Sequence, residues 1–200
     1  MKANRLQIFF ILLISICLGF SVQAANPLKI LKGKVTCEGK GVQGVMVTDG
    51  YRCVQTDASG KYSIPTLGES RFVYICTPSG YLTDRDGTIP SFYIPVDNSK
   101  KQNYNFQLKK NPKDDTSHVF IVQADIQVTA KDELKIYQNV VDDCKQLLSS
   151  YAPADIFGID CGDIVGDRPA LYPDYLQRVK QLDIPIYRTM GNHDMNYDGR

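Results

Sequence analysis

The sequence has almost no excess charge of either sign: 23 lysines and arginines stand against 22 aspartates and glutamates, a net charge of +1. This balance excludes a nucleic-acid binder held mainly by a basic surface, and it excludes a long acidic tail. Tryptophan is absent, but 12 tyrosines and 8 phenylalanines supply ample aromatic material for a core. Hydrophobic residues make up 43% and charged residues 22%, which indicates a globular chain rather than a disordered one.

The sequence also lacks an apolar run long enough to span a membrane. The candidate, residues 6–20, has 15 residues, whereas a spanning helix needs about 20. It follows Lys2 and Arg5 and precedes Val-Gln-Ala at residues 22–24, a small-x-small pattern. We therefore predict a cleaved signal peptide over residues 1–24, no transmembrane anchor, and a periplasmic, cell-surface or secreted protein. An uncleaved anchor helix is the alternative.

No pair of the six cysteines has the C-x-x-C spacing of a zinc site or redox pair. Five remain after removal of the leader, and an odd number in a chain of this size is not a disulfide framework. Cys144 and Cys161 lie in apolar segments, where a reduced cysteine acts as a small core residue. Pairing among Cys37, Cys53 and Cys76 stays open.

The first half of the chain, residues 28–108, consists of short apolar or alternating runs separated by turn sequences rich in Gly, Pro and Asp. Regularly spaced runs of this kind, with no helical period, predict an all-β, antiparallel sandwich. Asp-Arg-Asp-Gly at residues 84–87 is expected to be a turn rather than a calcium loop. The expected strands are residues 29–36, 45–48, 52–55, 61–64, 71–77, 92–96 and 103–108.

Three motifs of this half resemble the carboxypeptidase-regulatory-like or transthyretin-like β-sandwich modules. They are Gly-Lys-Val at residues 33–35, Gly-Val-Met-Val at 44–47 and Thr-Asp-Ala-Ser-Gly-Lys-Tyr at 56–62. The resemblance implies a β-sandwich domain over residues 25–110 that serves as a spacer or packing module and has no catalytic chemistry of its own. The alternative is an adhesion module in which this sandwich carries the function.

The pattern changes after a polar linker, residues 111–117, and residues 118–200 form the next predicted domain. Expected strands alternate with expected helices, which predicts parallel strands joined by right-handed crossovers. On the first helix, apolar positions at spacings of three and four mark one face: Leu134, Tyr137, Val141, Cys144 and Leu148. The expected strands are residues 119–124, 156–159 and 186–190, and the expected helices are residues 132–150 and 171–182.

Each of these strands ends in polar residues: Asp-Ile-Gln at 125–127, Gly-Asp-Ile-Val-Gly-Asp at 162–167 and Gly-Asn-His-Asp at 191–194. Ligands bind at the carboxyl ends of parallel strands, and these oxygen and imidazole donors suit two divalent cations that clamp a phosphoryl group. The alternatives are ordinary turn acids or helix caps, Asp167 above all. Residues 194–199 also match the first half of an EF-hand loop, without its final glutamate.

In this order the three motifs resemble the calcineurin-like metallophosphoesterase family, over residues 118–200. The resemblance implies an α/β/β/α sandwich, of which only the first parallel half is present here. It implies a hydrolase of phosphate monoesters or diesters, in which two divalent ions (Mn, Fe or Zn) present a metal-bound hydroxide to the phosphorus. The substrate would be a small phosphate ester or a lipid.

The resemblance also implies four metal ligands. Asp125 binds one metal, Asp163 bridges both, and Asn192 binds the second. Gln127 stands where the family commonly has histidine, and its neutral amide oxygen is a weaker donor than imidazole.

The catalytic pair implied by the resemblance is His193, which contacts the phosphate or assists the leaving group, with Asp194 as its partner. The family completes its site with a further histidine and a G-H-x-H motif downstream, which these 200 residues do not contain. We therefore expect them to be the N-terminal part of a longer enzyme, and to be inactive alone. The alternative is a secreted binding protein on a degenerate phosphoesterase scaffold.

Overall fold

The computed structural model describes residues 28–195 except 98, 101, 152 and 153. The predicted leader lies outside these residues and stays a prediction, and most of the EF-hand-like stretch lies outside them as well. Among the described residues, no helix combines the length and the apolar character needed to cross a membrane.

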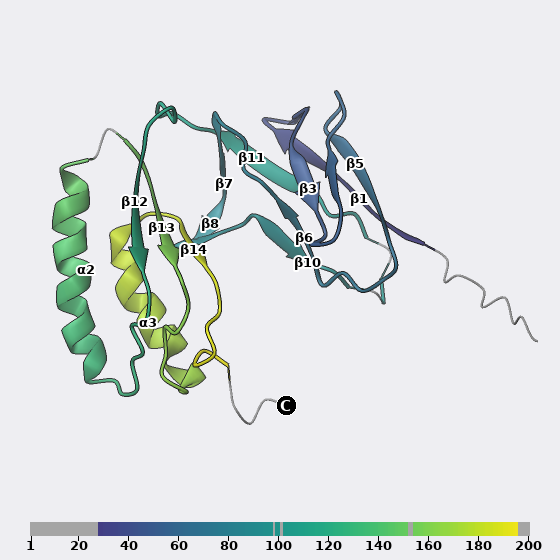
Figure 1. The fold of residues 1–200 in the computed structure, drawn as a ribbon. Helices are drawn as coiled ribbons and strands as arrows, with labels where there is room; N and C mark the ends of the chain where they lie inside the picture. The colour runs from purple at the N-terminus through teal and green to yellow at the C-terminus, as the bar shows by residue number, and fades with distance from the viewer. Residues whose placement is uncertain (1–27, 98, 101, 152–153, 196–200) are drawn as a thin grey trace, which may run out of the picture.

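Two β-sheets make up most of the first part of the chain, which also contains a separate short hairpin (Figure 1). Their strands alternate between buried and exposed residues, as in β5, where Tyr62, Ile64 and Thr66 are buried and their neighbours exposed. The first sheet has the order β2-β1-β11-β7, with β5 also paired to β1: β1 Lys29–Cys37, β2 Lys40–Gly41, β5 Lys61–Thr66, β7 Tyr81–Thr83 and β11 Phe106–Lys110. The second has the order β10-β6-β3-β4: β3 Met46–Thr48, β4 Cys53–Gln55, β6 Phe72–Ile75 and β10 Tyr93–Pro95.

One hydrophobic core joins the two sheets. Val35 and Leu108 contribute to it from the first sheet, and Val47 and Val73 from the second. The expectation of an all-β segment agrees with the structure, because the described part of residues 28–108 contains strands and turns and no helix. The five described cysteines are all free, so no disulfide supports this core within the described chain.

The prediction of a purely antiparallel arrangement was wrong for one pair. Strands β1 and β11 run parallel, with Val35 opposite Phe106 and Cys37 opposite Leu108. Tight turns make strands antiparallel when they are neighbours in sequence, but they do not fix the direction of two strands about seventy residues apart. The sequence patterns also did not predict β2, β7 and the hairpin β8–β9, whose strands have only two or three residues each.

The hairpin lies where we expected only a turn. Strand β8, Arg85–Asp86, pairs with β9, Ile89–Pro90, in antiparallel register. Gly87 has φ 57°, the left-handed conformation that a two-residue hairpin loop demands and that glycine adopts at low cost. The predicted turn is therefore present, with a short strand on either side.

The second part of the chain is a parallel sheet with the order β12-β13-β14, as the alternation of strands and helices predicts. Helix α2 buries four of the five residues predicted for its inner face, and Cys144 packs partly against the same core. The elements are β12 His118–Gln123, α2 Glu133–Ser149, β13 Asp155–Asp160, the 3₁₀ turn η1 Pro169–Leu171, α3 Tyr172–Val179, the 3₁₀ turn η2 Lys180–Leu182 and β14 Ile186–Arg188.

Two elements of the second part differ from prediction by more than one residue at an end. The second helix is an α-helix of eight residues with a 3₁₀ turn at each end, and Asp183 in the left-handed conformation closes it. Strand β14 ends at Arg188, two residues early. The opposite face of the sheet carries Phe120 and Val122, which are 55% and 56% exposed. The remaining layers of the predicted α/β/β/α sandwich stay a prediction.

Candidate functional site

Three loops leave the carboxyl ends of the parallel strands and meet at one edge of the sheet. The loop after β12 carries Asp125 and Gln127. The loops after β13 and β14 carry Asp163 and, further on, Asn192 and His193. Parallel strand direction produces this convergence, since the carboxyl ends of all three strands lie on the same edge.

Backbone hydrogen bonds hold the first two loops together. The amide of Asp125 donates to the carbonyl of Gly162 at 3.2 Å, and the amide of Gln127 donates to the carbonyl of Asp163 at 2.9 Å. The side-chain amide of Gln127 donates to Asp125 Oδ1 at 3.3 Å. This bond uses the nitrogen of Gln127 and leaves its oxygen free to act as an acceptor or ligand.

The third loop packs directly on Asp163. The backbone amide of His193 donates to Asp163 Oδ1 at 2.9 Å. A Cβ atom at position 191 would lie 2.3 Å from the amide nitrogen of Asp163, so only glycine allows this approach. Asn192 is exposed in the same turn. The fold thus brings the four predicted ligands onto adjoining loops.

Backbone strain is concentrated at these loops. Six non-glycine residues in the described chain have positive φ, and four of them are here: Asp125 at 52°, Gln127 at 45°, Asp163 at 52° and Asp167 at 56°. Such conformations are costly and cluster at functional sites, where the surrounding structure holds them. Aspartate adopts this conformation more readily than most residues, but residue type alone does not show which aspartates adopt it.

The partner of His193 is Asp167, not Asp194 as predicted. His193 Nδ1 lies 3.1 Å from Asp167 Oδ1, and the backbone amide of Asp167 donates to the carbonyl of His193. The alternative role for Asp167, capping the next helix, is also wrong, because the η1 turn has no side-chain cap. The hydrogen bond to Asp167 raises the pKa of His193 above its ordinary value of 6.5, and the charges of Asp163 and Asp125 act in the same direction.

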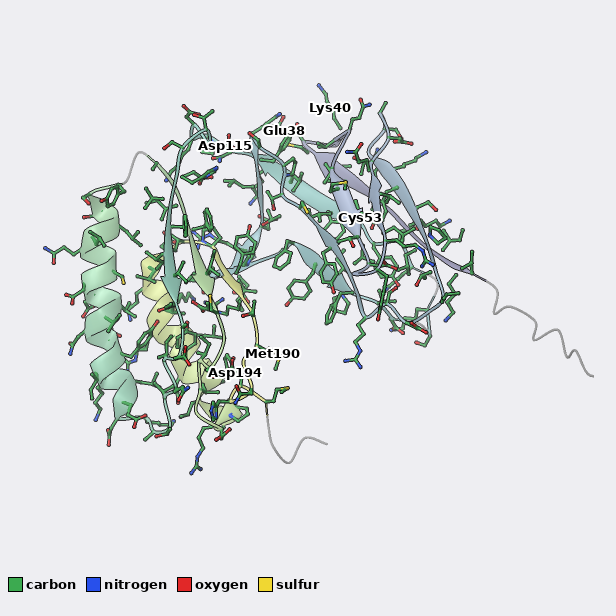
Figure 2. All side chains as sticks on the ribbon, in the orientation of Figure 1. Glu38, Lys40, Cys53, Asp115, Met190 and Asp194 are labelled. Carbon is green, nitrogen blue, oxygen red and sulfur yellow. The ribbon has the colours of Figure 1, made fainter. Side chains whose placement is uncertain are left out.

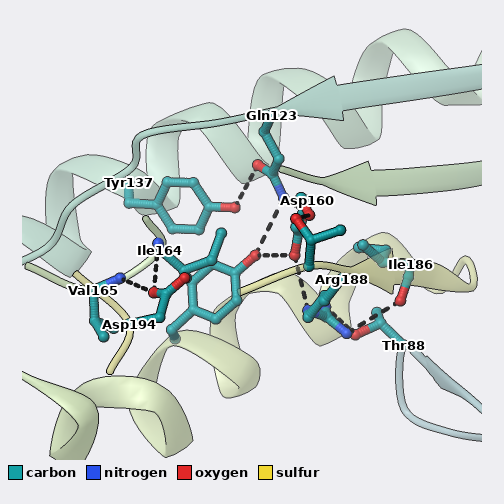
Figure 3. A network of polar contacts seen from close by, with 11 residues as sticks. Thr88, Gln123, Tyr137, Asp160, Ile164, Val165, Ile186, Arg188 and Asp194 are labelled. Atoms are coloured by element: carbon teal, nitrogen blue, oxygen red, sulfur yellow. Dashed lines mark hydrogen bonds and ion pairs between the residues drawn. The ribbon is translucent and has the colours of Figure 1, made fainter. Parts of the chain in front are cut away.

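Asp194 instead ties the loops together from within. Figure 2 places it in the loop beyond β14, and Figure 3 shows its carboxylate facing two backbone amides. Its side chain is buried, with 3% exposed, and Oδ1 accepts from Ile164 at 2.7 Å and Val165 at 3.0 Å. Oδ2 accepts from Gly191 at 2.9 Å. Burial favours a higher pKa for Asp194, but these hydrogen bonds outweigh it and lower the pKa. Asp194 is thus held by backbone amides, and the described side-chain contact of His193 is with Asp167.

The oxygen donors of the four predicted ligands are of the kind that hard divalent cations prefer. Asp125 and Asp163 offer carboxylate oxygens, and Gln127 and Asn192 offer neutral amide oxygens. Among the described residues, no three His, Cys, Asp or Glu side chains are grouped closely enough to hold a metal. The four oxygen donors therefore suit divalent cations by their chemistry, and further ligands are needed to complete a coordination shell.

Changing Asp167 to asparagine should lower the pKa of His193 toward 6.5, because the charged acceptor that favours the protonated ring is lost. The pair stabilises the fold below the unfolded pKa of histidine, and this contribution disappears as the pH rises through the raised folded value. An NMR titration of the ring in metal-free protein measures the shift. Asp155→Asn, beside His118 instead, should leave the His193 titration unchanged. An unaltered pKa in the Asp167 variant would show that the contact is absent in solution.

Comparison with known proteins gives one match. The family model for the N-terminal region of calcineurin-like phosphoesterases matches residues 29–111, less than half of the chain. The matched residues form the two β-sheets and precede the loops of the candidate site. No curated protein matches the chain, and no solved structure matches it. The resemblance of the sheets to carboxypeptidase-regulatory-like modules stays a prediction.

Proposed function

We propose that the complete protein is a metal-dependent hydrolase of phosphate esters and that the loops after β12, β13 and β14 form part of its active site. The observation that carries this proposal is the packing of the third loop on Asp163, which gathers carboxylate, amide and imidazole groups at the carboxyl edge of a parallel sheet. The family match of residues 29–111 supports the same class of protein.

In this proposal, Asp125, Gln127, Asp163 and Asn192 hold two divalent cations, with Asp163 between them. The cations would acidify a bound water and offset the negative charge of the phosphoryl group. The chain itself fixes the donors: the hydrogen bond from the amide of Gln127 to the carbonyl of Asp163 sets the spacing of the first two loops. Three of these four residues have a left-handed backbone, which the packing of the loops around them must hold in place.

His193 faces the substrate in this proposal. Its ring is about one-third exposed, and Asp167 favours the protonated form. A protonated ring can donate a hydrogen bond to a phosphoryl oxygen or pass its proton to the leaving oxygen. Asp194 does not take part in that transfer, and its role is to hold residues 191–194 against the loop after β13.

The test is the metal content and hydrolytic activity of the complete protein. After incubation with Mn²⁺ and removal of excess metal, we expect about two ions per chain and hydrolysis of p-nitrophenyl phosphate or bis(p-nitrophenyl) phosphate. Removal of metal by a chelator should abolish turnover, and added Mn²⁺ should restore it. A folded protein that binds one ion or none and cleaves neither ester would refute the enzyme and favour a degenerate binding scaffold.

A further inference from the structure

The hairpin β8–β9 belongs by sequence to the first part of the chain but packs on the second. The backbone amide of Ile186 in β14 donates to the carbonyl of Thr88 at 2.7 Å. Strand β14 is the last strand of the parallel sheet, so the hairpin covers part of an otherwise free strand edge. The side chain of Thr88 is 2% exposed, which shows that the hairpin tip is enclosed by this packing.

A second contact fastens the base of the hairpin. Arg85 Nη2 lies 2.7 Å from Asp183 Oδ1 and donates to the Asp183 carbonyl at 3.1 Å. Asp183 ends the η2 turn just before β14. The hairpin therefore contacts both the strand and the turn that leads into it.

The hydroxyl of Thr88 reaches an ion pair between the partly buried Arg188 and the fully buried Asp160 (Figure 3). Arg188 Nη2 donates to Thr88 Oγ1 at 2.8 Å, and Arg188 Nε lies 2.8 Å from Asp160 Oδ2. The second contact is close enough for an ion pair but too poorly aligned for a hydrogen bond. Asp160 has no exposed surface, so its charge needs the guanidinium group of Arg188 beside it. The acceptors that hold this group are Asp160, Thr88 and the carbonyl of Ile186 at 3.3 Å.

This ion pair lies where two loops of the candidate site begin. Asp160 and Arg188 are directly opposite in the register of β13 and β14. Asp163 follows Asp160 by three residues, and Asn192 follows Arg188 by four. The next residue, Thr189, donates from its amide to the carbonyl of Asp160 at 2.9 Å. A shift of Arg188 relative to Asp160 would therefore change the distance between the two loops.

We propose that Thr88 is a positioning residue of the candidate site: through Arg188 it fixes the register of β13 and β14 and so the separation of Asp163 from Asn192. The two β-sheets of the first part then serve the site by presenting this hairpin, beyond acting as a spacer. The inference rests on the proposed function where it is tested by Mn²⁺ binding. Its second test, hydrogen exchange at the amide of Gly191, depends on backbone geometry alone.

The test compares Thr88→Val with Thr88→Ser in the complete protein. Valine removes the hydroxyl and keeps the size and the backbone hydrogen bond to Ile186, whereas serine keeps the hydroxyl. We expect Thr88→Val to weaken Mn²⁺ binding about tenfold, as loss of an outer contact to a metal site does. In the same variant, the amide hydrogen of Gly191 should exchange with solvent faster than in the wild type. Thr88→Ser should bind Mn²⁺ close to wild type.

The matched control is Thr66→Val, which removes an equally buried hydroxyl in β5, hydrogen-bonded to Ser70 at 2.7 Å. It should leave both Mn²⁺ affinity and Gly191 exchange unchanged, even where it lowers stability. Wild-type Mn²⁺ affinity in Thr88→Val, or an equal loss in Thr66→Val, would overturn the proposal. If the wild-type protein binds no Mn²⁺, the proposed function fails, and Gly191 exchange alone decides the role of Thr88.

Discussion

Replacing Asp163 with asparagine should remove nearly all turnover of the complete protein while leaving its fold intact. We expect kcat to fall about 1,000-fold, which corresponds to about 4 kcal/mol of lost transition-state stabilisation. The reason is that the proposed bridging position loses its negative charge. Metal content should fall as well, because a neutral amide is a poor bridge between two cations. Initial rates with p-nitrophenyl esters and metal analysis of the purified variant measure both effects.

The geometry around Asp163 makes asparagine a clean substitution. Its φ of 52° is a conformation that asparagine adopts more readily than most residues. The hydrogen bond from the amide of His193 ends on Oδ1, and the oxygen of an asparagine can accept it in the same geometry. We therefore expect the free energy of unfolding to change by less than about 1 kcal/mol. Alanine would lose that hydrogen bond and strain the backbone, and its effect on activity would be ambiguous.

A matched control removes another negative charge from a left-handed residue far from the site. Glu38, at φ 50° in the exposed turn between β1 and β2, meets that description. Glu38→Gln should retain wild-type turnover and metal content. Asp163→Asn with near-wild-type kcat would refute the bridging role, and a similar loss in both variants would point to a general effect of charge.

Local patterns in the sequence were sufficient to predict the order of elements in the second part. The inner face of α2 follows from the spacing of Leu134, Tyr137 and Val141, and parallel strands follow from alternating strands and helices. The meeting of the three loops follows in turn, because parallel strands share a carboxyl edge. These inferences hold since each depends on residues close together in the chain or on a general rule of topology.

Contacts between loops could not be predicted in the same way. The sequence places Asp194 next to His193, but neighbouring residues in a tight turn point in different directions, and the ring meets Asp167 from another loop. The sequence gives one indication that Asp160 and Arg188 could pair: each is a charged residue at the carboxyl end of a strand that is mostly apolar. This indication does not reveal the register of the two strands, which decides whether the two residues meet.

The buried network around Asp160 yields the largest expected effect on stability. Asp160 accepts from Tyr175 at 2.8 Å and from Gln123 at 2.7 Å, and Arg188 supplies the only positive charge that the described chain pairs with it. Figure 3 shows Asp160 with Gln123 and Arg188 beside it, and Asp160 has no exposed surface. Changing Arg188 to methionine should lower the free energy of unfolding by about 3–5 kcal/mol, because it leaves a buried carboxylate without a counter-charge.

Urea unfolding followed by far-UV circular dichroism measures this loss, since both α-helices of the described chain lie in the second part. The decisive comparison is the double variant Arg188→Met with Asp160→Asn, which removes the charge along with its partner. It should be more stable than Arg188→Met by about 1–2 kcal/mol, because no buried charge is left unpaired. If both variants lose the same free energy, packing of the arginine side chain rather than charge pairing is what stabilises this junction. If Arg188→Met alone stays within about 1 kcal/mol of wild type, the ion pair is not buried in solution, and the hairpin tip at Thr88 does not enclose it.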